Sequence, residues 1–491
     1  MGTISSALNL MSQALDADQA ALNVTANNVA NASTPGYTEE TPTWQENDSI
    51  QINGVSVGTG ATETGATSQR DRVLEERLDQ QQQLASASGS RLTALNSIQA
   101  LFMPDSGSTS STAGDIGSDI TGFFQSFSSL EANPTNSALR ESVLSTASTL
   151  ATDISNAANG LNTQSTGLDQ QAAGAVGQVN ALTSAIAQLD TQIQSISPDA
   201  DAGTLEDQRQ LDLSQLSQLV GINQSSTENN GLAVTTTAGQ LLVSNSSSFQ
   251  LTTGSVAGVT QIFAGTANLT TQLASGGGSL GGDLTARDTD IPNTLASLDQ
   301  LAYTISTRVN AQNNAGTGAN GAAGTAIASS TTGAKTLDIF SPPPTLVANT
   351  ASGGTDVSGA AAAMSAVMTD PNLVAAAASG QGTGDNSNAI AMASLTNQTI
   401  VNGQTPTTFF SNFVSTLGST VSNVQTENTA QTASVSQLQS QNNAISSVNL
   451  NDEASALTTM ERSYQAASQM FATLNTIMTS ALNLGVDTAV T

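Results

Sequence analysis

Cysteine and histidine are both absent from the 491 residues of the chain. Without a thiol or an imidazole, the protein has no disulfides, no Cys/His zinc site and none of the nucleophilic centres that depend on either side chain. The sequence therefore predicts a fold that is stabilised by packing, and it predicts no catalytic residue, cofactor or metal site.

Basic and aromatic side chains are scarce. Ten Lys and Arg residues oppose 38 Asp and Glu residues, which gives a net charge of −28, and the first basic residue is Arg70. Because nucleic acids and anionic lipids are bound chiefly through Lys and Arg, this charge argues against both as partners. Aromatic residues make up 3% of the chain, and Trp44 is the single tryptophan.

Long apolar runs are also missing. None reaches the roughly 20 residues that a membrane-spanning helix needs. The N-terminus has no basic segment followed by an apolar one, which is the pattern of a secretory signal. We therefore expect neither membrane insertion nor a cleaved signal of the Sec type.

What the chain does have is a long periodic stretch at residues 450–484. Its apolar residues recur in alternating steps of three and four, a spacing that keeps one seam of a helix turned toward a partner helix. Glu453 is the one charged residue in the series. The seam positions are Leu450, Glu453, Leu457, Met460, Tyr464, Ala467, Phe471, Leu474, Met478 and Ala481.

A matching pattern begins the chain, with one apolar and one mixed line of residues that each recur every seven positions. Pro35 and Gly36 end this helix, because Pro lacks a donor and Gly permits a turn. The sequence thus predicts that the two ends of the chain pair as the halves of one coiled coil. The apolar line is Leu8, Leu15, Leu22 and Val29, and the mixed line is Ile4, Met11, Asp18 and Thr25.

Residues 26–37, ANNVANASTPGY, resemble the N-terminal signature of the bacterial flagellar axial proteins, a group that includes rod, hook and hook–filament junction proteins. The C-terminal helix, with YQAA at 464–467, resembles the same group. Within it, residues 205–209 and 276–292 are similar to the hook–filament junction family of the FlgK type. The resemblance covers most of the chain outside residues 315–371.

This resemblance implies a structural subunit that joins the flagellar hook to the filament, with its terminal helices in the inner part of a helical assembly. It also implies export by the flagellar type III apparatus without a cleaved signal, and a final place outside the cell at the hook–filament junction. The implied partners are further copies of the chain, the hook protein, a second junction protein of the FlgL type, and an export chaperone of the FlgN type that binds the C-terminal helix.

The resemblance places the assembly interface on both terminal helices and on the turn after the first. The Asn residues before this turn have two interpretations, hydrogen bonding at the helix end and contact with a neighbouring subunit, and we expect both to apply. After the turn the family usually has a basic residue, whereas this chain has Glu39 and Glu40. The expected interface residues are Leu8, Met11, Leu15, Leu22, Asn27, Asn28, Val29, Asn31, Pro35, Gly36, Tyr37, Leu457, Met460, Tyr464, Ala467, Phe471, Leu474 and Met478.

Between the termini, the periodicity predicts a mainly α fold with a smaller β part (α+β), built around a central bundle of long helices. A β-hairpin is predicted at 50–57, helices at 69–101, 154–196, 204–220 and 291–310, a small antiparallel sheet at 231–273, and helix again at 386–447. The expected domains are a coiled-coil segment at 1–40, a bundle domain at 41–314, a poorly ordered or small exposed Gly/Ala/Ser/Thr-rich insert at 315–371, returning helices at 372–447, and a coiled-coil segment at 448–491.

The longest periodic signal lies at residues 154–196 and ends at Pro198. Two lines of mostly apolar residues recur there every seven positions, which predicts a long helix packed within the molecule. The first line is Ile154, Leu161, Leu168, Ala175, Leu182, Leu189 and Ile196, and the second is Ala158, Ser165, Ala172, Val179, Ile186 and Ile193.

The charged clusters are expected to face solvent. At the start of the helix at 69–101, three Arg residues alternate with four acidic ones, which is typical of a solvated face with helical charge pairs. The later acidic groups lack the ligand spacing of a calcium loop, and Asp199 is a candidate helix cap. The first cluster is Arg70, Asp71, Arg72, Glu75, Glu76, Arg77 and Asp79, and the later groups are Asp199, Asp201, Glu206 and Asp207, and Asp288 and Asp290.

Two glycine motifs resemble catalytic or nucleotide-binding ones. Residues 277–281, GGSLG, match the nucleophile elbow of serine hydrolases, but the usual triad needs a His, so we expect a turn before a helix. Residues 316–321 match the dinucleotide fingerprint, but no strand precedes them, so we expect a loop.

The sequence thus favours a structural assembly protein over an enzyme. The first alternative is another axial protein, of the hook or the distal rod, against which residues 276–292 and the long helix argue. The second and less favoured alternative is a secreted acidic hydrolase, which the lack of His and the shortage of aromatic residues oppose.

Overall fold

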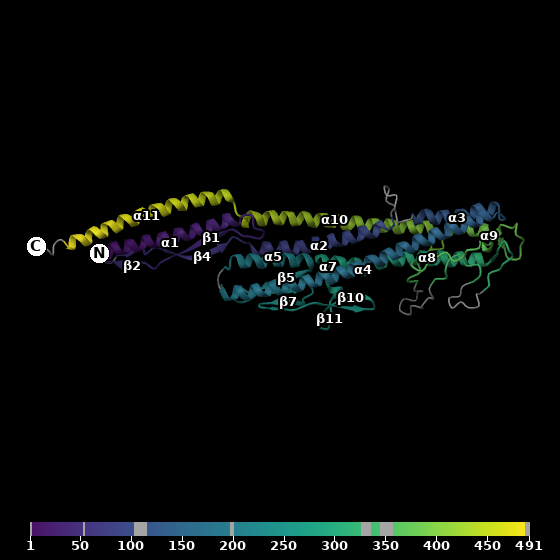
Figure 1. Ribbon diagram of the computed structural model, residues 1–491, viewed down its shortest axis with the longest axis horizontal. Helices are drawn as coiled ribbons and strands as arrows, with labels where there is room; N and C mark the ends of the chain where they lie inside the picture. Colours follow the sequence, from purple (N-terminus) through teal and green to yellow (C-terminus); the bar gives the residue numbers. More distant parts are fainter. Residues whose placement is uncertain are drawn as a thin grey trace.

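The computed structural model describes residues 2–52, 55–102, 115–196, 201–325, 335–343 and 357–486. The molecule is elongated, and both termini lie at the same end (Figure 1). We call that end the arm; it consists of helices α1 (Gly2–Asn31) and α11 (Leu450–Val486) and the strands between residues 40 and 68. The remainder is the body.

In the arm, α1 and α11 run antiparallel side by side (Figure 1). Strand β1 (Glu40–Glu46) pairs antiparallel with β4 (Ala61–Ser68), and both pack on α1. Strands β2 (Ile50–Ile52) and β3 (Val55–Val57) form the predicted hairpin, with Ile52 opposite Val55. The Asn-Gly turn between them lies outside the described residues.

Long helices form the scaffold of the body, as predicted. They are α2 (Arg72–Ala100), α4 (Ser137–Ile196) and α10 (Pro406–Ser446), which returns the chain from the far end of the body to the arm (Figure 1). Helix α2 begins three residues later than expected, because Asp71 caps it by accepting hydrogen bonds from the backbone N–H groups of Val73 and Leu74. None of the described helices is long and apolar enough to cross a membrane.

Helix α4 corrects the heptad prediction in one respect. The second line of residues stays in the core, with Ala172, Val179, Ile186 and Ile193 all buried, whereas the first line drifts outward until Ile196 is 69% exposed. A straight helix has about 3.6 residues per turn, so a seven-residue line rotates by roughly 20° per heptad. The line that starts nearer the edge of the buried face therefore leaves it first.

The region around residues 231–273, for which the sequence predicts one small sheet, contains two small antiparallel sheets. The first contains β5 (Ile222–Ser226), β6 (Leu232–Thr236), β7 (Leu241–Ser244) and β8 (Ser247–Ser248) in that order, and the second contains β9 (Thr252–Val256), β10 (Val259–Ala264) and β11 (Ala267–Asn268). The predicted alternation along β6 is confirmed, since Leu232, Val234 and Thr236 are buried. Strand β5 was missed because Ile222 is its single apolar residue.

Two hydrophobic clusters fill the body. One lies between α4, α5 (Thr204–Leu219), the sheets, α6 (Thr270–Ala274) and α7 (Gly278–Thr285). The other, at the far end, joins α2, α3 (Ile116–Ala132), α4, α8 (Ile291–Asn314), α9 (Ser387–Ser394) and α10. A π-helical turn (Ala286–Asp290) links α7 to α8, and short 3-10 turns flank α9 at Pro371–Leu373 and Leu395–Asn397.

The glycine motif at 277–281 is a turn followed by a helix, as expected, with Gly277 as the cap of α7. Its neighbour Gly282 explains why the segment is rich in glycine. A Cβ at Gly282 would lie 2.2 Å from the carbonyl oxygen of Ala87, so α7 and α2 approach each other more closely than any side chain at this position would permit.

The expectation that residues 315–371 form a small exposed insert is wrong for the described part. Leu337, Phe340 and Met364 are buried in the core of the far end, and the Phe340 ring lies 5.4 Å from that of Phe123. The amide of Asn310 donates to the backbone oxygen of Phe340 and accepts from its N–H, which satisfies irregular backbone inside the core. A few apolar residues within a Gly/Ala-rich segment were thus sufficient for burial.

Residues 316–321 are not a dinucleotide loop. Gly316 and Thr317 form strand β12, which pairs antiparallel with β13 (Ala377–Ala378), and Gly321 follows in a turn. This pairing joins the start of the expected insert to residues 377–378, which follow its end.

Candidate assembly arm and its junction with the body

The predicted seam of α11 is the side of the helix that the rest of the arm covers. Glu453 and Ala467 are buried, and Leu457, Met460, Phe471, Leu474 and Met478 are half-buried, while most of the residues between them are exposed. The Thr25 hydroxyl donates to the Met460 sulfur at 3.8 Å and the Asn28 amide donates to Glu453, so the two helices meet in antiparallel directions.

The apolar line of α1 agrees with the structure only in its first part. Leu8 is buried and Leu15 and Leu22 are half-buried, as is Met11 of the mixed line, but Val29 is 45% exposed. The line drifts around the helix, and the buried positions near its end are Ala21, Thr25 and Asn28 instead. Val29 therefore lies outside the contact between α1 and α11, and its place in an interface between subunits stays a prediction.

Helix α1 leaves part of the apolar surface of α11 uncovered. Met470, Ile477 and Leu482 are each about half exposed, and Tyr464 and Leu450 are exposed as well. Helix α11 thus has apolar side chains that the single chain leaves in contact with water.

Asn28 is a hydrogen-bonding centre at the base of the arm. Its Nδ2 donates to the Glu453 Oε1 at 2.7 Å and to the Glu40 backbone oxygen at 2.8 Å. Its Oδ1 accepts from the Tyr37 hydroxyl at 2.8 Å and from the Glu40 N–H at 3.0 Å. The amide therefore uses all its donors and acceptors within one chain.

The turn after α1 is held by its own residues. Asn31 donates to the backbone oxygen of Asn27 and accepts from the Thr34 hydroxyl, while Pro35 and Gly36 are exposed. Hydrogen bonding at the helix end is thus observed for Asn28 and Asn31. Asn27 is exposed, and contact with a neighbouring subunit stays a prediction for all three residues.

Tyr37 completes this centre. Burial, with the carboxylates of Glu40 and Asp207 nearby, raises the pKa of the Tyr37 phenol to about 12. The hydroxyl therefore remains a donor to Asn28 at any physiological pH. Glu39 links the same turn to the body, since its N–H donates to the backbone oxygen of Ser446 at the end of α10.

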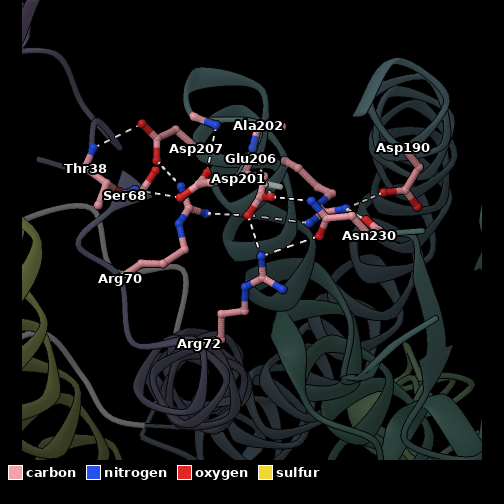
Figure 2. A network of polar contacts seen from close by, with 12 residues as sticks. Thr38, Ser68, Arg70, Arg72, Asp190, Asp201, Ala202, Glu206, Asp207 and Asn230 are labelled. Atoms are coloured by element: carbon pink, nitrogen blue, oxygen red, sulfur yellow. Dashed lines mark hydrogen bonds and ion pairs between the residues drawn. The ribbon is translucent and has the colours of Figure 1, made fainter. Parts of the chain in front are cut away.

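A buried ionic network joins the arm to the body, beside the start of β1 and the end of β4 (Figure 2). Arg70, whose side chain is 7% exposed, pairs with Asp207 at 2.5 Å and with Glu206 at 3.6 Å. Asp207 also accepts from the Thr38 N–H at 3.0 Å. The first turn of α5 thus holds Thr38, just before β1, and Arg70, just after β4.

The same network extends into the body. Asp201 accepts from the N–H groups of Ser68 at 2.6 Å and Gly203 at 2.8 Å. On the far side, Arg209 pairs with Asp190 of α4 at 2.7 Å and donates to the backbone oxygen of Asn230 at 2.9 Å (Figure 2). The contacts tie the arm, α4, α5 and the first sheet together.

Burial and hydrogen bonding act in opposite directions on these carboxyls. Burial raises the pKa values of Asp190 and Asp207 above the usual range, although their Arg partners and hydrogen bonds oppose it. At Asp201 burial also acts to raise the pKa, but the N–H donors of Gly203 and Ser68 outweigh it and hold the pKa below the usual range. On α2, burial raises the pKa of Glu75 to about 7.

The expectation that these charges face solvent is therefore wrong for most of them. Arg70, Glu75, Asp79, Glu206 and Asp207 are buried or nearly so. Charge pairs along a solvated helix would give the same pattern at 70–79, which is why the sequence favoured exposure. The sequence does not show that Arg70 contacts a carboxylate more than a hundred positions away. Of the first cluster, Asp71, Arg72 and Arg77 are exposed as expected.

Asp290 is a further correction. It is buried and forms a two-pronged ion pair with Arg91 of α2 at 2.8 and 2.9 Å, while Asp288 pairs with Arg287. Asp199 lies outside the described residues. Among the described residues, no cluster of three or more Asp and Glu side chains is arranged to hold a metal ion.

Comparisons with known proteins agree with this architecture. Residues 106–327 match the family described as the helical domain of the flagellar hook-associated protein FlgK, and residues 6–38 match the flagella basal body rod proteins. The second match spans most of α1 and the turn built around Asn28.

Several curated relatives of the chain share the name flagellar hook-associated protein 1. The flagellar hook-associated protein 1 of Escherichia coli (strain K12) is 26% identical over 98% of this chain and 100% of its own length, and that of Salmonella typhimurium gives the same values. The flagellar hook-associated protein 1 of Bacillus subtilis is 27% identical over 47% of this chain and 46% of its own length.

The fold has a solved counterpart. The structure of the flagellar hook junction protein FlgK from Burkholderia pseudomallei superposes with a TM-score of 0.62, at 19% identity, over 74% of this chain and 99% of that one. Paired terminal helices, the rod-protein signature and a helical body define a flagellar axial protein. Within that class, the chain carries a match to the helical domain of the FlgK family and is similar to flagellar hook-associated protein 1 over nearly its whole length.

Proposed function

We propose that this chain is a structural subunit of the bacterial flagellum that joins the hook to the filament and catalyses no reaction. The observation that carries the proposal is the incomplete burial of the arm. Two antiparallel helices cover each other along one seam and still leave Met470, Ile477 and Leu482 about half exposed. A subunit whose arm packs against the arms of its neighbours would bury them.

The energetics support assembly through the arm. Burying a Leu, Ile, Phe or Met side chain contributes roughly 1.5–3 kcal/mol, and an assembly repeats that gain in every subunit. The seam residues Phe471 and Leu474 are only half-buried in the single chain, so they too have surface left to bury. The ionic network around Arg70 would fix the direction in which the arm leaves the body.

The partners follow from the family. We propose that the arm contacts further copies of the chain, the hook protein on one side and a second junction protein of the FlgL type on the other. Before assembly, the C-terminal helix would bind an export chaperone of the FlgN type. Export by the flagellar type III apparatus, without a cleaved signal, would place the protein outside the cell, at the hook–filament junction. The names of the relatives and the match at residues 106–327 support this assignment over a hook or distal rod protein.

The test compares two neighbouring positions of α11. Leu474 is half-buried in the seam, whereas Thr473 is exposed and its hydroxyl only bonds the preceding turn of its own helix. We expect Leu474→Ala to leave export into the medium intact and hooks complete, while most cells lack filaments. Thr473→Ala should be nearly silent. Equal filament counts for both variants at equal export would contradict assembly through this seam.

A further inference from the structure

Glu453 is out of place in the seam that it occupies. It is 6% exposed, in a series of otherwise apolar positions, and none of the ion pairs among the described residues involves it. Its Oε1 instead accepts the hydrogen bond from Asn28, which is itself 1% exposed. A buried carboxylate without a cation loses hydration that one neutral hydrogen bond replaces only in part.

A Leu at the same position would continue the apolar seam and avoid that loss. A hydrogen-bonded polar pair, unlike an apolar pair, needs a particular distance and direction between its two side chains. The Asn28 amide already binds Tyr37 and both backbone groups of Glu40, so it is fixed in place on α1, and only one alignment of α11 brings Glu453 to it. A single polar residue in a coiled-coil seam sets register in this way.

Other alignments are open to the apolar residues. Leu8, Leu15 and Leu22 on one helix, and Leu457, Tyr464, Phe471 and Met478 on the other, repeat every seven residues. A shift of α11 by one heptad, about 10.5 Å, would match apolar residues again. Such a shift toward the body needs only the unwinding of the first two turns of α11.

We propose that the hydrogen bond between Asn28 and Glu453 fixes the register of α1 against α11. The pair selects one of several alignments that the apolar residues alone permit, and so determines which side chains the arm presents to its surroundings. This role lies within one chain and does not depend on the function proposed above.

The chain contains no cysteine, so introduced pairs report register without background. The pair Thr25→Cys with Met460→Cys reports the observed alignment, since these side chains touch. The pair Thr25→Cys with Ala467→Cys reports a shift by one heptad. Each pair is placed in the full-length chain with a native Asn28 and Glu453, with Glu453→Gln, and with Asn28→Leu plus Glu453→Leu, and is treated with a short bismaleimide.

We expect only the first pair to crosslink in the native and Glu453→Gln backgrounds, because glutamine keeps the acceptor oxygen. In the double-Leu background, the yield of the shifted pair should rise by about tenfold, which corresponds to ~1.4 kcal/mol of lost discrimination. The helix content measured by circular dichroism should not change.

Two results would overturn the proposal. One is a double-Leu chain that gives only the first crosslink at undiminished yield, since register would then be set by the apolar residues or the connections. The other is loss of both crosslinks together with loss of helix content, which would make the pair a source of stability and not of register.

Discussion

Replacing Arg70 should loosen the joint between arm and body far more than replacing its neighbour Arg72. Both guanidinium groups pair with Glu206, and judged by that distance alone Arg72 is the closer, at 2.7 Å against 3.6 Å. Burial separates the two, because the Arg70 side chain is 7% exposed and that of Arg72 is 54% exposed. Arg70 also holds Asp207 at 2.5 Å.

The expected magnitudes follow from this difference. Removing one partner of a buried ion pair leaves an uncompensated charge and costs about 3–5 kcal/mol. Glu206 and Asp207 keep other donors, the Asn230 amide and the Thr38 N–H, so Arg70→Met should fall near the lower end of that range. Exposed pairs contribute roughly 0–1 kcal/mol, which is the loss expected for Arg72→Met.

The assay is equilibrium urea unfolding of both variants, followed by circular dichroism, together with hydrogen exchange on peptides that contain Thr38 and Ser68. These two N–H groups donate to the network, and a local loss of about 3 kcal/mol should raise their exchange rates by roughly 100-fold in Arg70→Met. Equal destabilisation by both variants, or an Arg70→Met chain within ~0.5 kcal/mol of the native one, would refute the argument from burial.

Three further results are expected. Folding raises the pKa of Glu75 from 4.5 to about 7, so the folded state holds the proton more tightly than the unfolded state. The free energy of unfolding should therefore fall by up to about 3 kcal/mol as the pH rises through that window. Urea titrations should show a flatter pH dependence for Glu75→Gln. Asn28→Ala should lower the thermal midpoint of the arm, whereas Asn27→Ala should leave the free chain unchanged and reduce filament number, and equal midpoints would contradict the role given to Asn28. Phe340→Ala should cost about 3–5 kcal/mol in urea unfolding because the ring is fully buried, and a silent variant would show that its segment is not part of the core.

The arm was largely predictable from the sequence. Heptad spacing identified both terminal helices and the covered side of α11, since helical periodicity is a local property of the chain. The same spacing failed at Leu450 and Tyr464, which are exposed although they belong to the predicted seam of α11, and at Val29 and Ile196, the exposed last members of two seven-residue lines. Over four or more heptads the rotation of a straight helix moves a seven-residue line off the buried face, and the sequence does not show which line moves.

The joint between arm and body was not predictable. Arg70, Glu206 and Asp207 are charged residues with ordinary local explanations, and the contact between them depends on how α5 folds back beside α2. The helix-end hydrogen bonding expected of Asn28 is observed, but from the sequence its partner Glu453 was interpreted as a break in the seam and not as half of a hydrogen bond. Contacts between distant segments have no signature in the periodicity of either one.

The prediction for residues 315–371 failed for a different reason. Its composition resembles a flexible linker, and the prediction weighed composition over the few large apolar residues within it. Leu337 and Phe340 are fully buried, and the Asn310 side chain satisfies the backbone beside them. Neither feature has the spacing of a helix or a strand, so no periodic pattern pointed to it.

The central claim is that the chain occupies the junction between hook and filament, and its position on the cell tests that claim most directly. Because the chain has no cysteine, Val256→Cys, at an exposed site on β9 away from the arm, allows one dye to be attached in bacteria that carry this copy alone. The account predicts one fluorescent spot per flagellum, at the end of the hook where the filament begins. Label spread along the hook or the filament, or confined to the base of the flagellum, would contradict it.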